Sequence, residues 1–188
     1  MSQTQEDVAE GIASRVRAAR TGRRWTLDEL AARSGVSRRM LVQIEHAGAN
    51  PSLATLLKLA AALDITLTDL VSEQPDDEPV AVVSGHDART LWSTPAGSSA
   101  RLIVGHGPLE LWSWTLACGD RRAGEPHRPG SLELLSVHTG TVGLDVGDHH
   151  VDVAAGDSAW FDATRPHGYA NPGPAAATFA LVVLEPAG

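Results

Sequence analysis

Residues 25–70 read WTLDELAARSGVSRRMLVQIEHAGANPSLATLLKLAAALDITLTDL, and this stretch decides the fold of the N-terminal part of the chain. Thr26, followed three residues later by Glu29, predicts a capping box at the start of a helix. Gly35 predicts the end of that helix, and Ser37 predicts the N-cap of the next. Apolar residues recur at helical spacing on both sides of this turn. The pattern predicts five short helices, at about 6–20, 27–34, 38–46, 53–63 and 67–71.

Basic residues concentrate in the same part of the chain, although the whole protein carries a formal net charge of −8. Between Gly11 and Lys58, nine basic residues stand against three acidic ones. From Glu73 to the C-terminus, six basic residues stand against fifteen acidic ones. Because DNA phosphates attract Lys and Arg, the N-terminal part is expected to bind double-stranded DNA. The charge asymmetry predicts two domains with different partners.

Composition restricts the class of protein. With 188 residues, 43% of them hydrophobic and 20% charged, the chain suits one or two small folded domains rather than a disordered or collagen-like protein. The single cysteine, Cys118, argues against a disulfide-stapled secreted module. No apolar run approaches the ~20 residues of a membrane span, and the polar start MSQTQEDVAE does not resemble a signal peptide. We therefore expect a cytoplasmic protein without a membrane partner.

The turn at 34–37 joins two predicted helices in the most basic stretch of the chain, which fits the physical description of a helix-turn-helix. The core side is expected to hold Leu30, Ala31, Val36, Leu41 and Ile44. The outer, N-terminal side of the second helix then presents the candidate DNA-binding residues Ser37, Arg38, Arg39, Met40 and Gln43. Arginine pairs with guanine and glutamine with adenine in the major groove, and a helix N-terminus favours a phosphate. The alternative is a solvated basic face on a helical bundle.

Residues from Ile12 to Val71 resemble the lambda-repressor/Cro-like helix-turn-helix family, of the xenobiotic-response-element type. The resemblance runs through both helices of the motif, the Gly-Val-Ser turn, the Ile-Glu pair at 44–45 and the Asn-Pro-Ser opening of the fourth helix. It implies sequence-specific binding in the DNA major groove. One departure is Leu27, where the family usually has a glutamine. The DNA contact of that glutamine is expected to be lost, or replaced by Arg23 or Arg24.

The segment SEQPDDEP, residues 72–79, is acidic, contains two prolines and lacks apolar residues, which is typical of a linker. Beyond it, strand-like runs from VAVV (80–83) to ATFALVVL (177–184) alternate with clusters of Gly, Pro, Asp and Asn. Short strands at near-regular spacing predict a sandwich or barrel. The expected organisation is therefore a helical DNA-binding domain at 6–71, a linker at 72–79 and an all-β domain at 80–188.

Two stretches of the β part carry histidine and carboxylate residues: GEPHRPGSLELLSVHTG (124–140) and GDSAWFDATRPHGYAN (156–171). Histidine and carboxylate side chains from separate strands suit a divalent transition metal such as Zn, Fe, Ni or Mn. Such a set leaves positions open for water or a ligand, as in a sensor or a catalytic site. The competing interpretation makes His127 and His167 hydrogen-bonding pocket residues without a metal.

These two stretches resemble the two cupin motifs, which the family writes as G-x5-H-x-H-x3–4-E-x6-G and G-x5-P-x-G-x2-H-x3-N. Gly119, His127, Glu133 and Gly140 can be placed in the first motif, whereas Gly156, His167 and Asn171 fit the second. Glu125 stands in place of a histidine, five residues rather than four separate His127 from Glu133, and Asp162 and Thr164 replace the usual Pro and Gly. The resemblance implies a small double-stranded β-helix barrel with an internal metal set of Glu125, His127, Glu133 and His167.

The candidate ligand pocket takes its residues from the same barrel. Trp112 and Trp114 alternate with Leu116 on one predicted strand, so all three point the same way. If that face is inward, the indoles suit a flat, apolar or cationic ligand. Tyr169 and Asn171 follow in step with His167 and complete the candidate pocket. The alternative is that the tryptophans simply fill the core of the barrel.

The arrangement of a helix-turn-helix followed by a cupin is itself a recognisable family of transcriptional regulators. It implies an operator-binding homodimer whose cupin domain senses a small-molecule effector, with no catalytic residues. The first alternative is a metal-dependent dioxygenase or isomerase of the cupin type fused to a DNA-binding domain. The second is a phage-like repressor that acts through protein contacts and has a filled β pocket.

Overall fold

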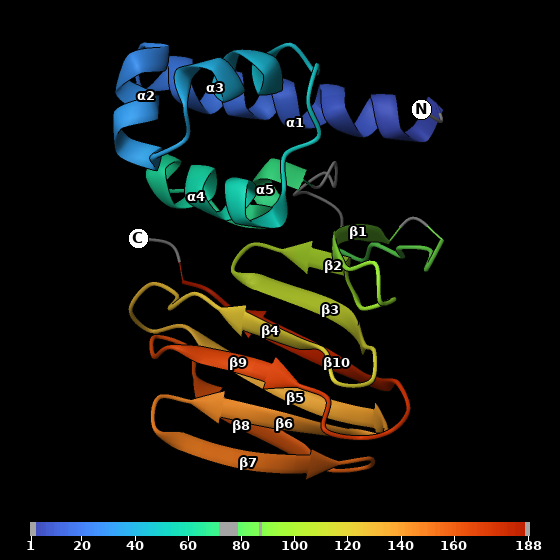
Figure 1. The fold of residues 1–188 in the computed structure, drawn as a ribbon. Coiled ribbons are helices and arrows are strands. Elements are labelled where there is room, and N and C mark those ends of the chain that lie inside the picture. Colours follow the sequence, from blue (N-terminus) through green and yellow to red (C-terminus); the bar gives the residue numbers. More distant parts are fainter. Residues whose placement is uncertain (1–2, 72–78, 87, 187–188) are drawn as a thin grey trace. The chain divides into compact units, whose positions relative to one another are not determined.

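The computed structural model describes residues 3–71, 79–86 and 88–186 of the chain. These residues form two compact units, a helical one that extends to Ala81 and a β-rich one from Val82 to Pro186 (Figure 1). The predicted linker, 72–79, lies outside the described residues apart from Pro79. The predicted combination of a five-helix bundle with an all-β domain is confirmed.

The helical unit contains five helices at almost the predicted places. They are α1 (Gln3–Gly22), α2 (Leu27–Ser34), α3 (Arg38–Glu45), α4 (Leu53–Leu63) and α5 (Leu67–Val71). Apolar side chains from all five are buried together, among them Val16, Leu30, Leu41, Leu56 and Leu70. Helix propensity alone would not hold segments of five to eleven residues, so the bundle depends on this shared core.

Local signals fix the turn between α2 and α3. Thr26 and Glu29 form the predicted capping box, in which each side chain accepts a backbone N–H of the other residue. Gly35 ends α2 with a φ of 67°, in the left-handed region that glycine adopts without a steric penalty. The Ser37 hydroxyl accepts the N–H of Met40 and caps α3. The chain therefore reverses tightly between the two helices of the motif.

The β unit has ten strands in two sheets. The strands are β1 (Arg89–Ser93), β2 (Ser99–His106), β3 (Leu109–Leu116), β4 (Arg121–Gly124), β5 (Leu132–Thr139), β6 (Thr141–Val146), β7 (His149–Ala154), β8 (Ser158–Asp162), β9 (His167–Ala170) and β10 (Ala177–Leu184). The larger sheet has the order β1-β2-β3-β10-β5-β8, and the smaller has the order β4-β9-β6-β7. All pairs are antiparallel. Figure 1 shows the two sheets facing each other.

Ring contacts join the two sheets across the core. Tyr169, on β9 of the smaller sheet, lies 5.6 Å from Trp114 on β3 and 5.6 Å from Phe179 on β10, measured between ring centroids. Alternate residues of β3 and β10 are buried, as expected for strands with one face toward the core. The core of the β unit therefore lies between the sheets, with aromatic residues at its centre.

The predicted strand at 80–83 is wrong. Val80 and Val82 are 76% and 93% exposed, and this segment is not part of either sheet. A run of valines favours a strand only where a neighbouring strand and a core cover it, and neither is present here.

After β3, Cys118 is exposed in the turn that leads to β4. Among the described residues, no helix is long and apolar enough to cross a membrane.

Candidate functional site

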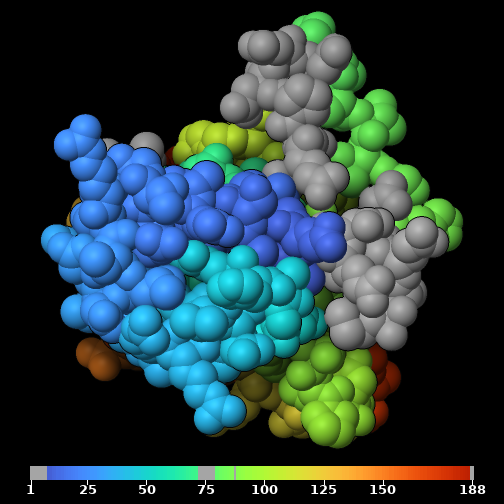
Figure 2. Space-filling model, turned by 90° about the horizontal axis from the view of Figure 1, so that it is seen from above, coloured from blue at the N-terminus to red at the C-terminus, as the bar shows by residue number. Residues whose placement is uncertain are grey.

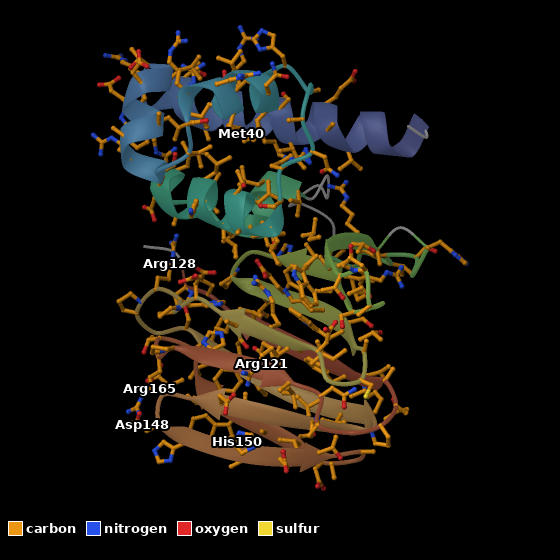
Figure 3. All side chains as sticks on the ribbon, in the orientation of Figure 1. Met40, Arg121, Arg128, Asp148, His150 and Arg165 are labelled. Carbon is orange, nitrogen blue, oxygen red and sulfur yellow. The ribbon has the colours of Figure 1, made fainter. Side chains whose placement is uncertain are left out.

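All five candidate DNA-binding residues lie on the surface of the helical unit. Ser37, Arg38, Arg39, Met40 and Gln43 are exposed, whereas Leu41 and Ile44 of the same helix are buried. In Figure 2, the α2 and α3 region, in light blue to cyan, lies at the surface beside α1 in dark blue. Figure 3 labels Met40, which is 41% exposed, on α3. The N-terminal half of α3 thus presents two guanidinium groups, an amide and a thioether to solvent.

The start of α2 carries Leu27, at the position where the helix-turn-helix family usually has a glutamine. Leu27 is half-buried at the first position of α2, where it has no polar group to offer DNA. Arg23 and Arg24 are both exposed just before the helix, and Arg24 adopts a φ of 58°. Trp25 is half-buried and lies under the Arg33 guanidinium, 4.3 Å from ring centroid to Cζ. Trp25 therefore packs against a cation.

A buried ion pair holds α3 against α1. The Arg20 Nε and Nη2 atoms lie 2.6 and 2.8 Å from the two carboxylate oxygens of Glu45, and the side chains are 13% and 6% exposed. Arg20 also donates to the carbonyl oxygen of Trp25 at 2.7 Å. The hydrogen bond to Glu45 raises the pKa of Arg20. Such a two-point contact fixes orientation as well as distance, so the angle of α3 depends on this pair.

The Arg20–Glu45 pair could not be predicted from the sequence pattern. The two residues are 25 positions apart, and nothing in the spacing shows that α1 and α3 pack together. The exposed pair of Arg38 Nε and Asp28 Oδ1, 3.1 Å apart, provides a contrast because its side chains are 61% and 76% exposed. Solvent weakens an ion pair of that kind, whereas the Arg20–Glu45 pair is largely shielded from it.

Three of the four predicted metal ligands converge in the β unit. His127, Glu133 and His167 each offer a ligand atom, and the three atoms lie within 4.8 Å of one another. The Glu133 Oε1 atom is 3.4 Å from His127 Nε2 and 3.6 Å from His167 Nε2. His127 precedes β5, Glu133 lies on β5 and His167 begins β9. One carboxylate oxygen of the larger sheet therefore faces one imidazole nitrogen from the smaller sheet and one from the loop before β5.

The loops around this cluster meet at one end of the β unit. The His127 N–H donates to the Ala163 carbonyl at 2.9 Å, and the Gly147 N–H donates to the Pro166 carbonyl at 2.8 Å. Figure 3 shows Arg128, Asp148 and Arg165, which lie on these loops, on the same side of the unit. His127 is thus held by a loop and His167 by the start of β9, and the loops at this end are tied together through their backbones.

The imidazole of His167 is oriented by its surroundings. Its Nδ1 atom lies 2.8 Å from the carbonyl oxygen of Arg165, so this nitrogen carries the proton and leaves a lone pair on Nε2. Nε2 is the atom that faces Glu133. A backbone carbonyl bonded to the far nitrogen is the usual second contact of a metal-binding histidine. A Cβ atom at Gly124 would lie 2.4 Å from the same Nε2, so only glycine leaves this space open.

Burial keeps the two histidines neutral. Burial, followed by the neighbouring His167, lowers the pKa of His127 to about 4. Burial likewise lowers the pKa of His167. The Nδ1 atom of His127 makes no hydrogen bond but lies 3.8 Å from a carboxylate oxygen of Glu185, whereas its Nε2 atom faces Glu133. Two neutral imidazoles beside a carboxylate form a donor set that fits a divalent transition metal.

Glu133 itself is buried, and its carboxylate accepts a hydrogen bond from the Tyr169 hydroxyl. Burial raises the pKa of Glu133 to about 7, against the opposing effect of that hydrogen bond. Burial also raises the pKa of Tyr169 well above its ordinary value. Tyr169, a predicted pocket residue, therefore contacts the cluster directly.

The fourth predicted ligand, Glu125, does not join the cluster. It is exposed in the loop after β4, whose last residue is Gly124. The alternation of β4 turns Arg122 and Gly124 toward Tyr169 and His167, so the next residue falls on the opposite side, where the Glu125 side chain is exposed. The resemblance to the cupin motif predicted Glu125 as a metal ligand only because of its position in the sequence. The structure assigns the cluster to His127, Glu133 and His167.

The other predicted pocket residues are buried but have structural partners. Trp114 packs against Trp92, Trp112 and Phe179, with ring centroids 5.5, 6.4 and 5.7 Å away. Its indole N–H is buried without a hydrogen-bond partner. Asn171 donates to the carbonyls of Leu116 and Ala175 and accepts the N–H of Gly173, so it fastens the chain before β10. The tryptophans therefore contribute to the core of the barrel, and Asn171 stabilises its loop.

Glu110 is a further buried carboxylate, which is absent from the residues predicted for the site. It is 6% exposed on β3, and its Oε2 atom accepts the indole N–H of Trp112 at 2.9 Å. Burial raises the pKa of Glu110 to about 7. Val183 of β10 pairs with Glu110 on one side and Glu133 on the other, so both carboxylates belong to the inner face of the same sheet.

Comparisons with known proteins agree with this two-part structure. A model of the helix-turn-helix family matches residues 16–70, and a cupin domain model matches residues 112–184. The chain is 27% identical over 184 residues to the HTH-type transcriptional regulator SutR of Escherichia coli (strain K12), covering 96% of this chain and 98% of that protein.

Solved structures show the same likeness. An HTH_3 family transcriptional regulator from Vibrio cholerae superposes with a TM-score of 0.72 at 26% identity, over 97% of this chain and 99% of that one. The Fe(II) form of the protein HppE gives a TM-score of 0.51 at 17% identity, over 94% of this chain and 100% of that one. The second likeness concerns the fold alone.

Proposed function

Because this chain is a transcriptional regulator with a helix-turn-helix domain and a cupin domain, we propose that it binds operator DNA as a homodimer and senses a small molecule. The observation that carries the DNA-binding part is the exposed N-terminal half of α3, held in place by the buried Arg20–Glu45 pair. The proposal includes a cytoplasmic location, where the DNA of a bacterial-type regulator lies.

Arg38, Arg39 and Gln43 read base edges in the major groove, and Ser37 and Met40 contact the backbone and bases beside them. One helix of this length contacts too few base pairs for specificity, so two copies are needed, reading half-sites one helical turn apart. An effector changes operator affinity only if it binds one arrangement of the dimer more tightly than another.

A mobility-shift assay with the DNA upstream of the protein's own gene tests this assignment. Replacing both Arg38 and Arg39 with alanine is expected to lower specific affinity by about 100-fold, since each good base contact is worth about 1–3 kcal/mol. The matched control is Arg165→Ala, which removes an exposed arginine from the β unit. If the double variant binds the operator as tightly as this control does, the recognition-helix assignment is wrong.

In the cupin domain, we propose that His127, Glu133 and His167 hold one divalent transition metal, with Zn, Fe, Ni and Mn as candidates. The support is the oriented lone pair of His167 and the convergence of one ligand atom from each of the three residues within 4.8 Å. A bound metal would supply a Lewis acid for an oxygen or nitrogen group of the effector. The side chains of this chain would orient that group, and the aromatic core beside Tyr169 would exclude water from it.

Metal analysis of the purified protein tests the metal site. Glu133→Ala and His167→Ala are each expected to lower bound metal about 10-fold or more, because each removes one of three ligands. Glu125→Ala is the matched control and should retain the wild-type content, since Glu125 is exposed outside the cluster. Equal metal content in all four proteins would contradict the assignment.

The same cluster supports one alternative function, a metal-dependent cupin enzyme fused to a DNA-binding domain. Three protein ligands leave open coordination positions for a substrate, as in catalytic sites. The regulator proposal predicts that a ligand found by thermal shift is recovered chemically unchanged after prolonged incubation with the metal-loaded protein. Conversion of that ligand over many turnovers would establish the enzyme instead.

A further inference from the structure

The outer face of the larger sheet is unusual because three neighbouring strands carry no Asp, Glu, Lys or Arg on it. The outward positions of β3, β5 and β10 are Leu109, Leu111, Ser113, Thr115, Leu132, Leu134, Ser136, His138, Thr178, Ala180, Val182 and Leu184. An antiparallel sheet that faces water normally alternates apolar residues inside with polar and charged ones outside. The absence of charge is more notable in a protein whose net charge is −8.

Apolar side chains on this face form continuous rows across the strands. Trp160 of β8 pairs with Leu134 of β5, which pairs with Val182 of β10, which pairs with Leu111 of β3. In the next row outward, Leu132, Leu184 and Leu109 are paired in the same way. Because paired residues on one face lie side by side, these seven side chains form one patch, called the apolar sheet face below.

The most prominent members of the apolar sheet face are well exposed. Trp160 is 73% exposed, Leu134 is 50%, Leu109 is 49% and Leu132 is 36%. An exposed tryptophan beside three exposed leucines is a costly arrangement in water. Contiguous apolar patches of this kind mark sites of protein association.

We propose that the apolar sheet face is the surface on which a second copy of this chain packs, face to face, about a two-fold axis. An isologous interface needs a surface that complements itself, and the apolar rows of β3, β5 and β10 do so because they bring no like charges together. Trp160 at one edge reaches across toward the partner's leucines. This proposal gives the homodimer of the preceding section its interface.

The size of the face suits the hydrophobic core of a dimer interface rather than the whole interface. With strands roughly 4.8 Å apart and roughly 3.3 Å per residue, the eight-residue strands β3, β5 and β10 together with β8 cover about 450 Å² in projection. The accessible area of a corrugated surface is larger than its projection. A standard interface buries about 800 Å² per partner, with a hydrophobic core inside a polar rim. The apolar sheet face supplies the core, and Asp162 and Ser158 begin the rim on β8.

The five helices of this chain offer no matching apolar surface. Within their described residues, Met40 is the one large apolar side chain that is exposed, and it lies on the candidate DNA-binding side of α3. A polar or charged partner would lose solvation without gaining a counter-charge on this face. A second copy, which brings the same apolar rows, is the occupant that these observations favour.

Sedimentation equilibrium of the full chain, without DNA or effector, tests the interface. The wild type is expected to be a dimer at roughly 10 µM, and Trp160→Glu and Leu134→Glu are each expected to raise the dimer dissociation constant by about 100-fold or more, since each change occurs twice per dimer. The matched control is Val151→Glu. Val151 is also 50% exposed, but it lies on β7 of the smaller sheet, and the variant should remain a dimer.

Circular dichroism and thermal melting confirm that each variant is folded, since the substituted side chains are already exposed in the single chain. A dimeric wild type whose Trp160→Glu and Leu134→Glu variants dimerise as tightly would overturn the proposed interface but leave the proposed homodimer intact. A monomeric wild type would overturn both. Hydrogen exchange that shows a protected sheet face in a monomer would identify another part of the chain as its cover and would equally refute the proposal.

Discussion

The Arg20–Glu45 pair is expected to determine the stability of the helical unit. Glu45→Ala removes two short charge-assisted hydrogen bonds and leaves Arg20, 13% exposed, with only the Trp25 carbonyl as a partner. Breaking a buried pair in this way costs about 3–5 kcal/mol. Because Arg20 keeps one bond and lies near the surface, the lower value, about 3 kcal/mol, is expected. A domain of this size then melts about 12–24 °C lower.

Urea unfolding, followed by circular dichroism of the helices, measures this loss in the full chain. Asp28→Ala is the matched control, because it breaks an ion pair whose side chains are 61% and 76% exposed. Its cost should stay below about 1 kcal/mol. A double-mutant cycle with Arg20→Met separates the pair energy from the loss of packing. The reasoning is refuted if Glu45→Ala costs no more than Asp28→Ala.

Three further predictions concern single positions. Glu110 has a pKa raised to about 7, so the folded state keeps its proton between about pH 4.5 and 7 while the unfolded state loses it, and the free energy of unfolding falls as the pH rises through this window. Glu110→Gln has no proton to lose, so the variant should lack about 3 kcal/mol of this decrease in the free energy of unfolding. If the free energies of unfolding of variant and wild type differ by the same amount at about pH 5 and about pH 8, the prediction is wrong. Gly124→Ala forces a methyl group against His167 Nε2, so it should lower the free energy of unfolding by about 1–3 kcal/mol and weaken metal binding. A melting temperature and a metal content equal to those of the wild type would show that the His167 ring moves aside freely. Gly35→Ala should cost about 1 kcal/mol because of its φ of 67°, while Gly22→Ala, in open helical surroundings, should cost nothing measurable in the same urea titration.

Much of the helical unit was predictable because its signals are local. A capping box, a glycine with positive φ and a serine N-cap each depend on residues within one turn, so α2 and α3 begin where Thr26 and Ser37 predict. The Arg20–Glu45 pair depends instead on how α1 crosses α3. A pattern of single-helix periodicity contains no information about that crossing.

The β unit was predictable in class but less so in detail. Strands β4, β7, β8 and β9 were not singled out, because strands of four to six residues show little hydrophobic alternation: β7 is almost wholly exposed, and β9 is buried but contains His and Gly. The valines at 80–83 had the composition of a strand but no neighbour to pair with. Strand formation depends on a partner elsewhere in the chain, which composition does not reveal.

For the site, the cupin motifs identified three cluster residues, and geometry excluded Glu125. The same alternation that placed Trp112 and Trp114 on one face also applies to Glu110, two residues earlier. Its inward position was therefore available from the sequence. A charged residue at an otherwise apolar strand face is easily taken for an exposed one, although it is a strong signal of an internal polar site.

The exposed thiol of Cys118 gives this protein a natural reporter. Since the chain has one cysteine, a maleimide spin label or fluorophore attaches at a single place, in the turn after β3, without any engineered substitution. Two labelled copies in one assembly then contribute one distance, which pulsed electron resonance or energy transfer can follow as DNA, metal or a small molecule is added. The arrangement of the barrels would thus be measurable in the unmodified sequence.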